Sequence, residues 1–121
     1  MNALVRSRSF AYLQQRECCF YCGLPMWQSD KRGFAKRHGL SDRQAARLQC
    51  TAEHLTSRSE GGGNGTGNIV AVCLYCNRHR HMAANPLPPD RYKARVRNRV
   101  SRGRWHGLSI KHGRQRYPAT P

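Results

Sequence analysis

The chain has 121 residues, enough for one small domain, and carries 22 Lys and Arg against 6 Asp and Glu, a formal net charge of +16. Leu, Ile, Val and Phe number only 19, about one residue in six, a composition typical of disordered chains. Six cysteines and six histidines argue for a fold instead, because small domains with a weak apolar core are commonly held by disulfides or metal ions. No run of about 18 apolar residues is present, which excludes a membrane-spanning helix.

The N-terminal residues lack the apolar stretch of a secretory signal, so we expect a cytoplasmic protein. Thiols stay reduced in that compartment. Six cysteines could in principle pair as disulfides, but this setting favours metal binding as their role.

The positive charge is uneven along the chain. Residues 1–77 hold ten basic and five acidic residues, net +5, whereas residues 78–121 hold twelve basic and one acidic residue, net +11. Arg outnumbers Lys 18 to 4, and a guanidinium can pair with two phosphate oxygens at once. This pattern indicates a nucleic acid partner in preference to a membrane surface or to charge that serves solubility alone.

In chain order, four elements are predicted before the glycine-rich stretch. They are a helix over 2–15, a short strand and turn over 18–23, a helix over 41–48 and a strand over 48–55. Residues 24–40 are expected to be irregular, with at most a turn of helix around 34–37. The second helix has the clearest start, because Ser41 and Gln44 fit a capping box.

The second half begins with a loop over 56–67, where five glycines fall within seven positions. From Asn68 a helix is expected, since apolar residues recur there at helical spacing: Ile69, Val72, Cys73 and Cys76. Prolines at 86–89 form a hinge, a basic helix with a narrow apolar stripe is expected over 90–102, and a flexible tail over 103–121.

Two Cys-x-x-Cys pairs, separated by 50 residues, are the strongest chemical motif: Cys19, Cys22, Cys73 and Cys76. Zinc takes four ligands tetrahedrally and each pair supplies two, so we expect a structural zinc ion that clamps two parts of the fold. Cys18 could compete with Cys19 as a ligand, and Cys50 reads as a small buried residue.

Three stretches carry a resemblance to a known family. They are Cys-Phe-Tyr-Cys-Gly at 19–23, Glu-His-Leu-Thr-Ser-Arg-Ser-Glu-Gly-Gly at 53–62 and Gly-Asn-Ile-Val-Ala-Val-Cys-Leu-Tyr-Cys-Asn at 67–77. Together they resemble the HNH endonucleases of the ββα-metal (His-Me finger) fold, in the four-cysteine zinc subtype. The resemblance covers 19–23 and 51–81, about a third of the chain, and implies a small α+β fold.

The resemblance also implies roles for single residues. His54 matches the general base, and Glu53 and Asn77 match the ligands of one catalytic divalent ion, Mg²⁺ or Mn²⁺. Asn68 matches the residue that braces the loop and aims the histidine, so the chain is an HNN variant. The implied products are a 5′-phosphate and a 3′-hydroxyl. His79 and His81, three and five positions after Cys76, could assist in phosphate or metal contact, but a role as solvated helix residues is the favoured interpretation.

These expectations divide the chain into an HNH nuclease domain over 1–85, with an insertion at 24–48, and a basic helix and tail over 86–121. The expected activity is restriction-endonuclease-like hydrolysis of double-stranded DNA. The alternative is a non-catalytic, zinc-stabilised module that binds DNA or RNA and has a vestigial nuclease site. Expected nucleic acid contacts are Arg58, Arg78, Arg80, Arg91, Lys93, Arg95, Arg97, Arg99, Arg102 and Arg104.

Overall fold

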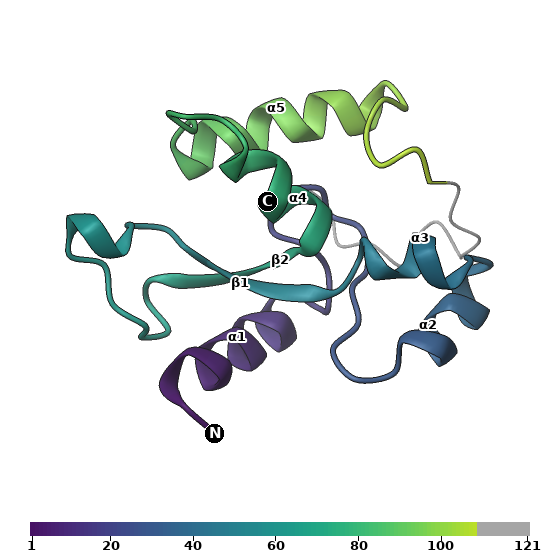
Figure 1. Ribbon diagram of the computed structural model, residues 1–121, viewed down its shortest axis with the longest axis horizontal. Coiled ribbons are helices and arrows are strands. Elements are labelled where there is room, and N and C mark those ends of the chain that lie inside the picture. Colours follow the sequence, from purple (N-terminus) through teal and green to yellow (C-terminus); the bar gives the residue numbers. More distant parts are fainter. Residues whose placement is uncertain (109–121) are drawn as a thin grey trace.

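The computed structural model describes residues 1–108, which form a small α+β fold with one two-stranded antiparallel sheet (Figure 1). None of the helices in this range has the length and apolar character needed to cross a membrane. The elements in chain order are α1 (Ala3–Gln14), α2 (Lys31–His38), α3 (Asp42–Ala46), β1 (Cys50–His54), the 3₁₀ helix η1 (Arg58–Glu60), β2 (Ile69–Cys73), α4 (Leu74–His81) and α5 (Pro89–Ser101).

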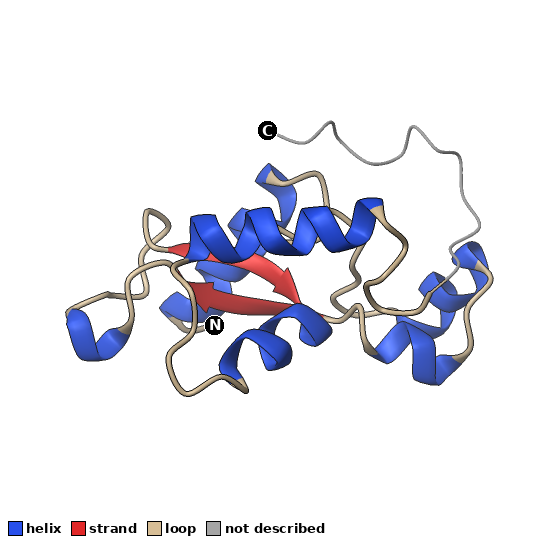
Figure 2. Ribbon diagram, turned by 90° about the horizontal axis from the view of Figure 1, so that it is seen from above, coloured by secondary structure: helices blue, strands red, loops and turns tan. Residues whose placement is uncertain are grey.

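The centre of the fold is the β1–β2 hairpin and the helix that follows it. The register pairs Cys50 with Cys73 and His54 with Ile69, and β2 runs directly into α4. Helix α1 lies on one side of the strands, and α4 and α5 lie on the other (Figure 1). Seen from the α5 side, that helix lies over the strands (Figure 2). The two strands are therefore covered on both faces.

The helix expected from Asn68 is wrong over its first turn, because 69–73 is the strand β2 and helix begins only at Leu74. Three of the five β2 residues are Ile or Val, which favour strands. A strand buried on both faces is apolar throughout, so its residues can also satisfy a helical spacing. Here Ile69 and Val72 of β2, followed by Cys73 and Cys76, happen to fit a helical spacing, and this produced the wrong prediction.

Residues 24–48 contain two helices that pack beside the end of the sheet (Figure 1). The capping box of α3 is confirmed: Ser41 Oγ accepts from the Gln44 N–H at 3.0 Å, and the Gln44 side chain accepts from the Ser41 N–H at 2.9 Å. Phe34 and Leu48 are buried in the common core. The segment 24–48 thus shares the core of the rest of the fold.

The basic helix predicted over 90–102 is α5, which begins at Pro89. Its apolar stripe docks as expected: Tyr92 and Val96 are buried, and the Tyr92 hydroxyl donates to the Cys76 carbonyl at 3.3 Å. Residues 103–108, expected to be flexible, instead fold back with His106 buried. The rest of the predicted tail, 109–121, lies outside the described residues.

Candidate metal centre and active-site cleft

The four cysteines of the two Cys-x-x-Cys pairs converge into one buried cluster, with all sulfur atoms within 4.8 Å of one another. Three backbone N–H groups point at Cys19 Sγ, those of Tyr21, Cys22 and Cys73, at 3.3 to 3.4 Å. The turn that presents the first pair needs Gly23, whose φ of +78° lies in the left-handed region. The backbone is therefore arranged to stabilise negatively charged sulfur.

This donor set fits a metal ion. Four sulfurs bound tetrahedrally to zinc at about 2.3 Å lie about 3.8 Å apart, and Cys22 Sγ lies 3.9 Å from Cys73 Sγ. Burial raises the pKa of Cys73 and Cys76 well above the ordinary range, so both stay ionised at neutral pH only beside a cation. The cluster could therefore hold a zinc ion.

The two remaining cysteines are buried outside this cluster. Cys18, considered as an alternative ligand to Cys19, directs its thiol to the Arg16 carbonyl at 3.4 Å. Cys50 lies in the apolar core, as predicted. All six cysteines are free thiols.

A second group of polar residues surrounds the carboxylate of Glu53. The residue is 4% exposed, and Oε2 accepts from Arg80 Nη1 at 2.8 Å and from the Tyr21 hydroxyl at 2.9 Å. The other oxygen, Oε1, lies 2.9 Å from His81 Nε2. Burial and the Glu53 carboxylate raise the pKa of Tyr21, so the phenol keeps the proton that it donates. Three side chains thus fix one carboxylate.

His54 follows Glu53 at the end of β1 and is held by the glycine-rich loop. Its Nε2 lies 2.8 Å from Asn64 Oδ1. With that oxygen as acceptor, Nε2 carries the proton, and Nδ1 keeps the lone pair that a general base needs. The backbone carbonyl of Asn64 accepts a hydrogen bond from the Ser7 hydroxyl of α1 at 2.6 Å, and this bond links the loop to α1.

Asn68 joins the two ends of the same loop. Its Oδ1 accepts from the Thr56 N–H at 2.7 Å, and its Nδ2 donates to the carbonyls of Thr56 and Gly63 at 3.0 and 2.9 Å. Gly62 lies so near that a Cβ atom would stand 1.8 Å from the Thr56 carbonyl oxygen. The loop that carries Asn64 can therefore close only with glycine at this position.

Asn77 and His81 lie one turn apart on α4 and both reach toward β1. The Asn77 amide nitrogen donates to Thr51 Oγ1 at 2.9 Å and to the Ala52 carbonyl at 3.3 Å. His81, whose side chain is 49% exposed, is the α4 imidazole that meets Glu53. The structure therefore brings to the carboxylate a residue that the sequence reading left as solvated.

A cleft of about 560 Å³ opens over these groups, and its lining includes Glu53, His54, Arg58, Arg80 and His81. Its lining also includes Pro86 and Pro88 from the connection between α4 and α5, and Pro89 at the start of α5. The cleft therefore brings together two imidazoles, two carboxylates (the second is that of Glu60) and two guanidinium groups.

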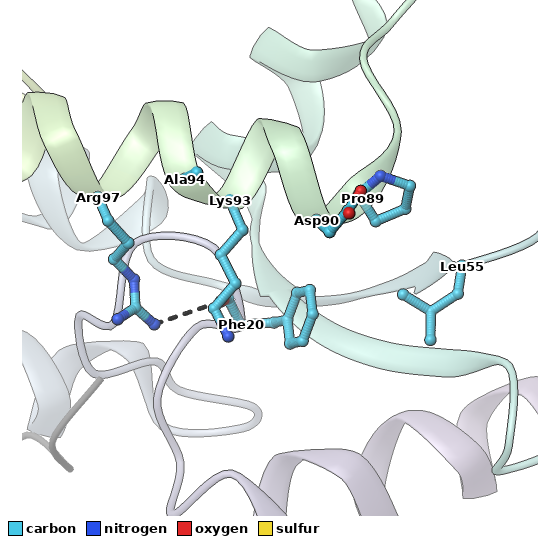
Figure 3. A pocket seen from close by; sticks show the side chains of 7 residues that line it. All are labelled: Phe20, Leu55, Pro89, Asp90, Lys93, Ala94 and Arg97. Carbon is cyan, nitrogen blue, oxygen red and sulfur yellow. Dashed lines mark hydrogen bonds between the residues drawn. The ribbon is translucent and has the colours of Figure 1, made fainter. Parts of the chain in front are cut away.

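A second cavity of about 620 Å³ shares Leu55 and Pro89 with the cleft and extends along α5 (Figure 3). There Lys93 lies over the Phe20 ring, with Nζ 4.4 Å from the centroid. Arg97 donates to the Phe20 carbonyl at 3.3 Å. Two basic groups of α5 thus contact the first Cys-x-x-Cys turn.

The ten residues expected to contact nucleic acid fall into two groups. Arg80, Lys93 and Arg97 are partly buried and contact protein groups. The others are exposed: Arg58, Arg78, Arg91, Arg95, Arg99, Arg102 and Arg104.

The sequence reading missed two residues that support the cleft, Tyr21 and Asn64, and it favoured a solvated position for His81, which contacts Glu53. The position of His81, one helical turn after Asn77, was a usable signal once α4 was placed. Tyr21 and Asn64 had no such signal, because their partners are distant in sequence or lie across a loop.

Comparison with known proteins agrees with this geometry. The family model described as HNH endonuclease matches residues 35–82, a range that includes β1, the glycine-rich loop, β2 and α4. Neither the curated proteins nor the solved structures gave a match. Residues 35–82 therefore resemble an HNH endonuclease domain, and this likeness points in general terms to a nuclease-type function and a nucleic acid partner.

Proposed function

We propose that the protein is a metal-dependent HNH endonuclease that hydrolyses DNA phosphodiester bonds. The observation that carries this proposal is the cleft itself, in which His54 and the Glu53–His81 pair line one space of about 560 Å³. The match to the HNH family over the same residues supports it.

His54 is the proposed general base. Its Nε2 is bound to Asn64, which leaves Nδ1 to take a proton from the attacking water. Histidine is the side chain that most often serves as a general base in enzymes. Asn68 supports the same role at a distance, because it closes the loop that positions Asn64.

Glu53 is the proposed anchor of the catalytic ion, Mg²⁺ or Mn²⁺, together with Asn77 and His81. Two ligands at right angles around an ion at about 2.1 Å are about 3 Å apart. The 2.9 Å between Glu53 Oε1 and His81 Nε2 fits that spacing. Asn77 donates through its nitrogen, so its oxygen is the atom that could bind a cation. When bound, such an ion would polarise the phosphate and stabilise the departing 3′ oxygen.

Basic residues supply the expected hold on the substrate. Arg58 and Arg80 line the cleft and could neutralise the phosphate next to the cut. Four exposed arginines of α5 and the residue after it could bind the backbone further away: Arg91, Arg95, Arg99 and Arg102. An extended basic surface beside the cleft supports double-stranded DNA as the substrate.

A plasmid cleavage assay with Mg²⁺ or Mn²⁺ tests the proposal. His54→Ala should reduce cleavage at least about 100-fold, as expected for loss of a general base. His79→Ala is the matched control, because it removes an exposed α4 histidine that does not line the cleft. Full activity of His54→Ala would refute the mechanism.

Additional variants and substrates in the same assay test the metal ligands, the substrate class and the non-catalytic alternative. His81→Ala and Asn77→Ala should each raise the Mn²⁺ concentration needed for half-maximal cleavage, because each would remove one ligand. Single-stranded DNA and RNA, tested beside duplex DNA, identify the substrate class. Binding that survives Glu53→Gln and His54→Ala, with no cleavage by the unmodified protein under any divalent ion, would favour the non-catalytic binding module.

A further inference from the structure

The segment after α5 returns to the four-cysteine cluster. Trp105 Nε1 lies 3.3 Å from Cys76 Sγ and is the hydrogen-bond donor, since an indole nitrogen has no lone pair to offer. His106 follows and is 4% exposed. Its ring stacks on Tyr75 of α4, with centroids 4.2 Å apart and planes at 30°. This segment lies outside the residues matched by the family model.

His106 contacts two of the sulfur atoms at once. Its Nε2 lies 3.6 Å from Cys22 Sγ and 3.5 Å from Cys73 Sγ, one cysteine from each pair. The other ring nitrogen, Nδ1, is buried and has no hydrogen-bond partner among the described residues. The cysteine sulfurs are thus the polar contacts of this buried imidazole.

The backbone holds His106 in this place. Its φ of +67° is in the left-handed region, which a non-glycine residue adopts rarely. Arg47, beyond the end of α3, donates through Nη1 to the His106 carbonyl at 2.9 Å. A residue held in an unfavourable conformation by its surroundings is a candidate for a specific role.

Hydrogen-bond donation fits His106 better than coordination. Four cysteines already complete a tetrahedral site, and four thiolates with one Zn²⁺ leave a net charge of about −2 in a buried place. N–H groups directed at the sulfurs spread that charge, as groups around metal ligands commonly do. His106 and Trp105 together reach three of the four cysteines.

We propose that His106 and Trp105 close the four-cysteine metal centre from outside its coordination sphere, as N–H donors to the cysteine sulfurs. The metal centre then fixes the chain directly after α5, which places the C-terminal end of the basic helix. This proposal depends on metal binding by the cysteines and does not depend on catalysis in the cleft.

Metal release tests the proposal on the full chain. We would load the protein with zinc, add a chromophoric chelator in excess and record the rate of zinc transfer. His106→Ala should release zinc at least about 10-fold faster, the lower end of the effect of losing a partner of a metal ligand. His106→Gln keeps an N–H donor and should recover part of this loss. An unchanged rate in His106→Ala would overturn the proposal.

His79→Ala is the matched control for packing. His79 also stacks on Tyr75, with centroids 4.0 Å apart, but none of its hydrogen bonds among the described residues goes to a cysteine sulfur. It should release zinc at the rate of the unmodified protein. Equal acceleration in both variants would overturn the proposal in favour of simple aromatic packing. If His106→Ala does not fold, Trp105→Phe decides: it keeps an aromatic ring but removes the N–H at Cys76 Sγ, so it should release zinc faster than the unmodified protein, and an unchanged rate would overturn the proposal.

Cobalt substitution distinguishes donor from ligand. Co²⁺ bound by four sulfurs should give the same absorption bands in His106→Ala as in the unmodified protein, and a shifted spectrum would show that His106 coordinates the metal and overturn the proposal.

In a Trp27→Phe background, Trp105 is the only tryptophan. Its fluorescence should become more accessible to acrylamide in His106→Ala, and unchanged quenching would contradict the predicted fixing of the segment.

Discussion

Replacing Arg80 by Met should destabilise the protein by about 3 kcal/mol. The change keeps much of the aliphatic side chain but removes the guanidinium, which donates to Glu53 at 2.8 Å and twice to the Leu87 carbonyl, at 3.1 and 2.8 Å. Removing one partner of a buried ion pair costs about 3–5 kcal/mol, because the other charge is left in a poorly solvated place. The lower end applies, since Tyr21 and His81 still contact Glu53.

The assay is urea unfolding of zinc-saturated protein, followed by circular dichroism. For a chain of this length, about 3 kcal/mol corresponds to a fall of about 10 °C in the melting temperature. Arg78→Met, an exposed change on the same helix, should stay within about 0.5 kcal/mol. In a Glu53→Gln background the effect of Arg80→Met should fall to about 1 kcal/mol, the value of the bonds to Leu87. An Arg80 effect equal to that of Arg78, or unchanged in that background, would refute this account of the pair.

Three further outcomes are expected. Gly62→Ala, whose Cβ would meet the Thr56 carbonyl oxygen at 1.8 Å, should displace the loop and lower plasmid cleavage more than it lowers stability, as comparison of the two assays would reveal. Cys50, whose pKa burial raises to about 12, should resist iodoacetamide at pH 8 in the folded protein, and rapid alkylation seen by mass spectrometry would contradict its burial. Burial favours the neutral thiol of Cys50 in the folded state. Its contribution to the free energy of unfolding is therefore fully present below the unfolded pKa near 9 and is lost as the pH rises toward 12. Replacing exposed arginines by Gln should reduce the slope of log Kd against log salt by about 0.9 for each lost phosphate contact, and an unchanged slope would exclude these residues from the interface: Arg91, Arg95 and Arg102.

The sequence was most informative where function depends on spacing within a short stretch. The two Cys-x-x-Cys turns, the capping box of Ser41 and the apolar stripe of α5 each occupy a few residues, so their patterns survive without knowledge of the fold. The adjacent pair Glu53–His54 belongs to the same class, and both residues do line the cleft.

Features built by contacts between distant segments could not be predicted in this way. Tyr21 and Glu53 are 32 positions apart, and Cys22 and His106 are 84 apart. The composition of the last segment, rich in Arg and Gly, favoured a flexible tail, and nothing local indicated that His106 would be buried. The β2 error has another origin, because a fully buried strand loses the alternation that identifies a strand.

The position of Tyr21 matters for experiments in which metal is removed from the protein and then supplied again. Tyr21 lies between the two cysteines of the first Cys-x-x-Cys turn, and its hydroxyl donates to the Glu53 carboxylate of the cleft. Loss of the ion at the cysteines would therefore disturb Glu53 as well, although no ligand is shared between the two places. A preparation stripped by a strong chelator and resupplied with Mg²⁺ alone should stay inactive, and recovery should require zinc first. Metal dependence measured without that order of addition would attribute to the cleft a requirement that belongs to the cysteine cluster.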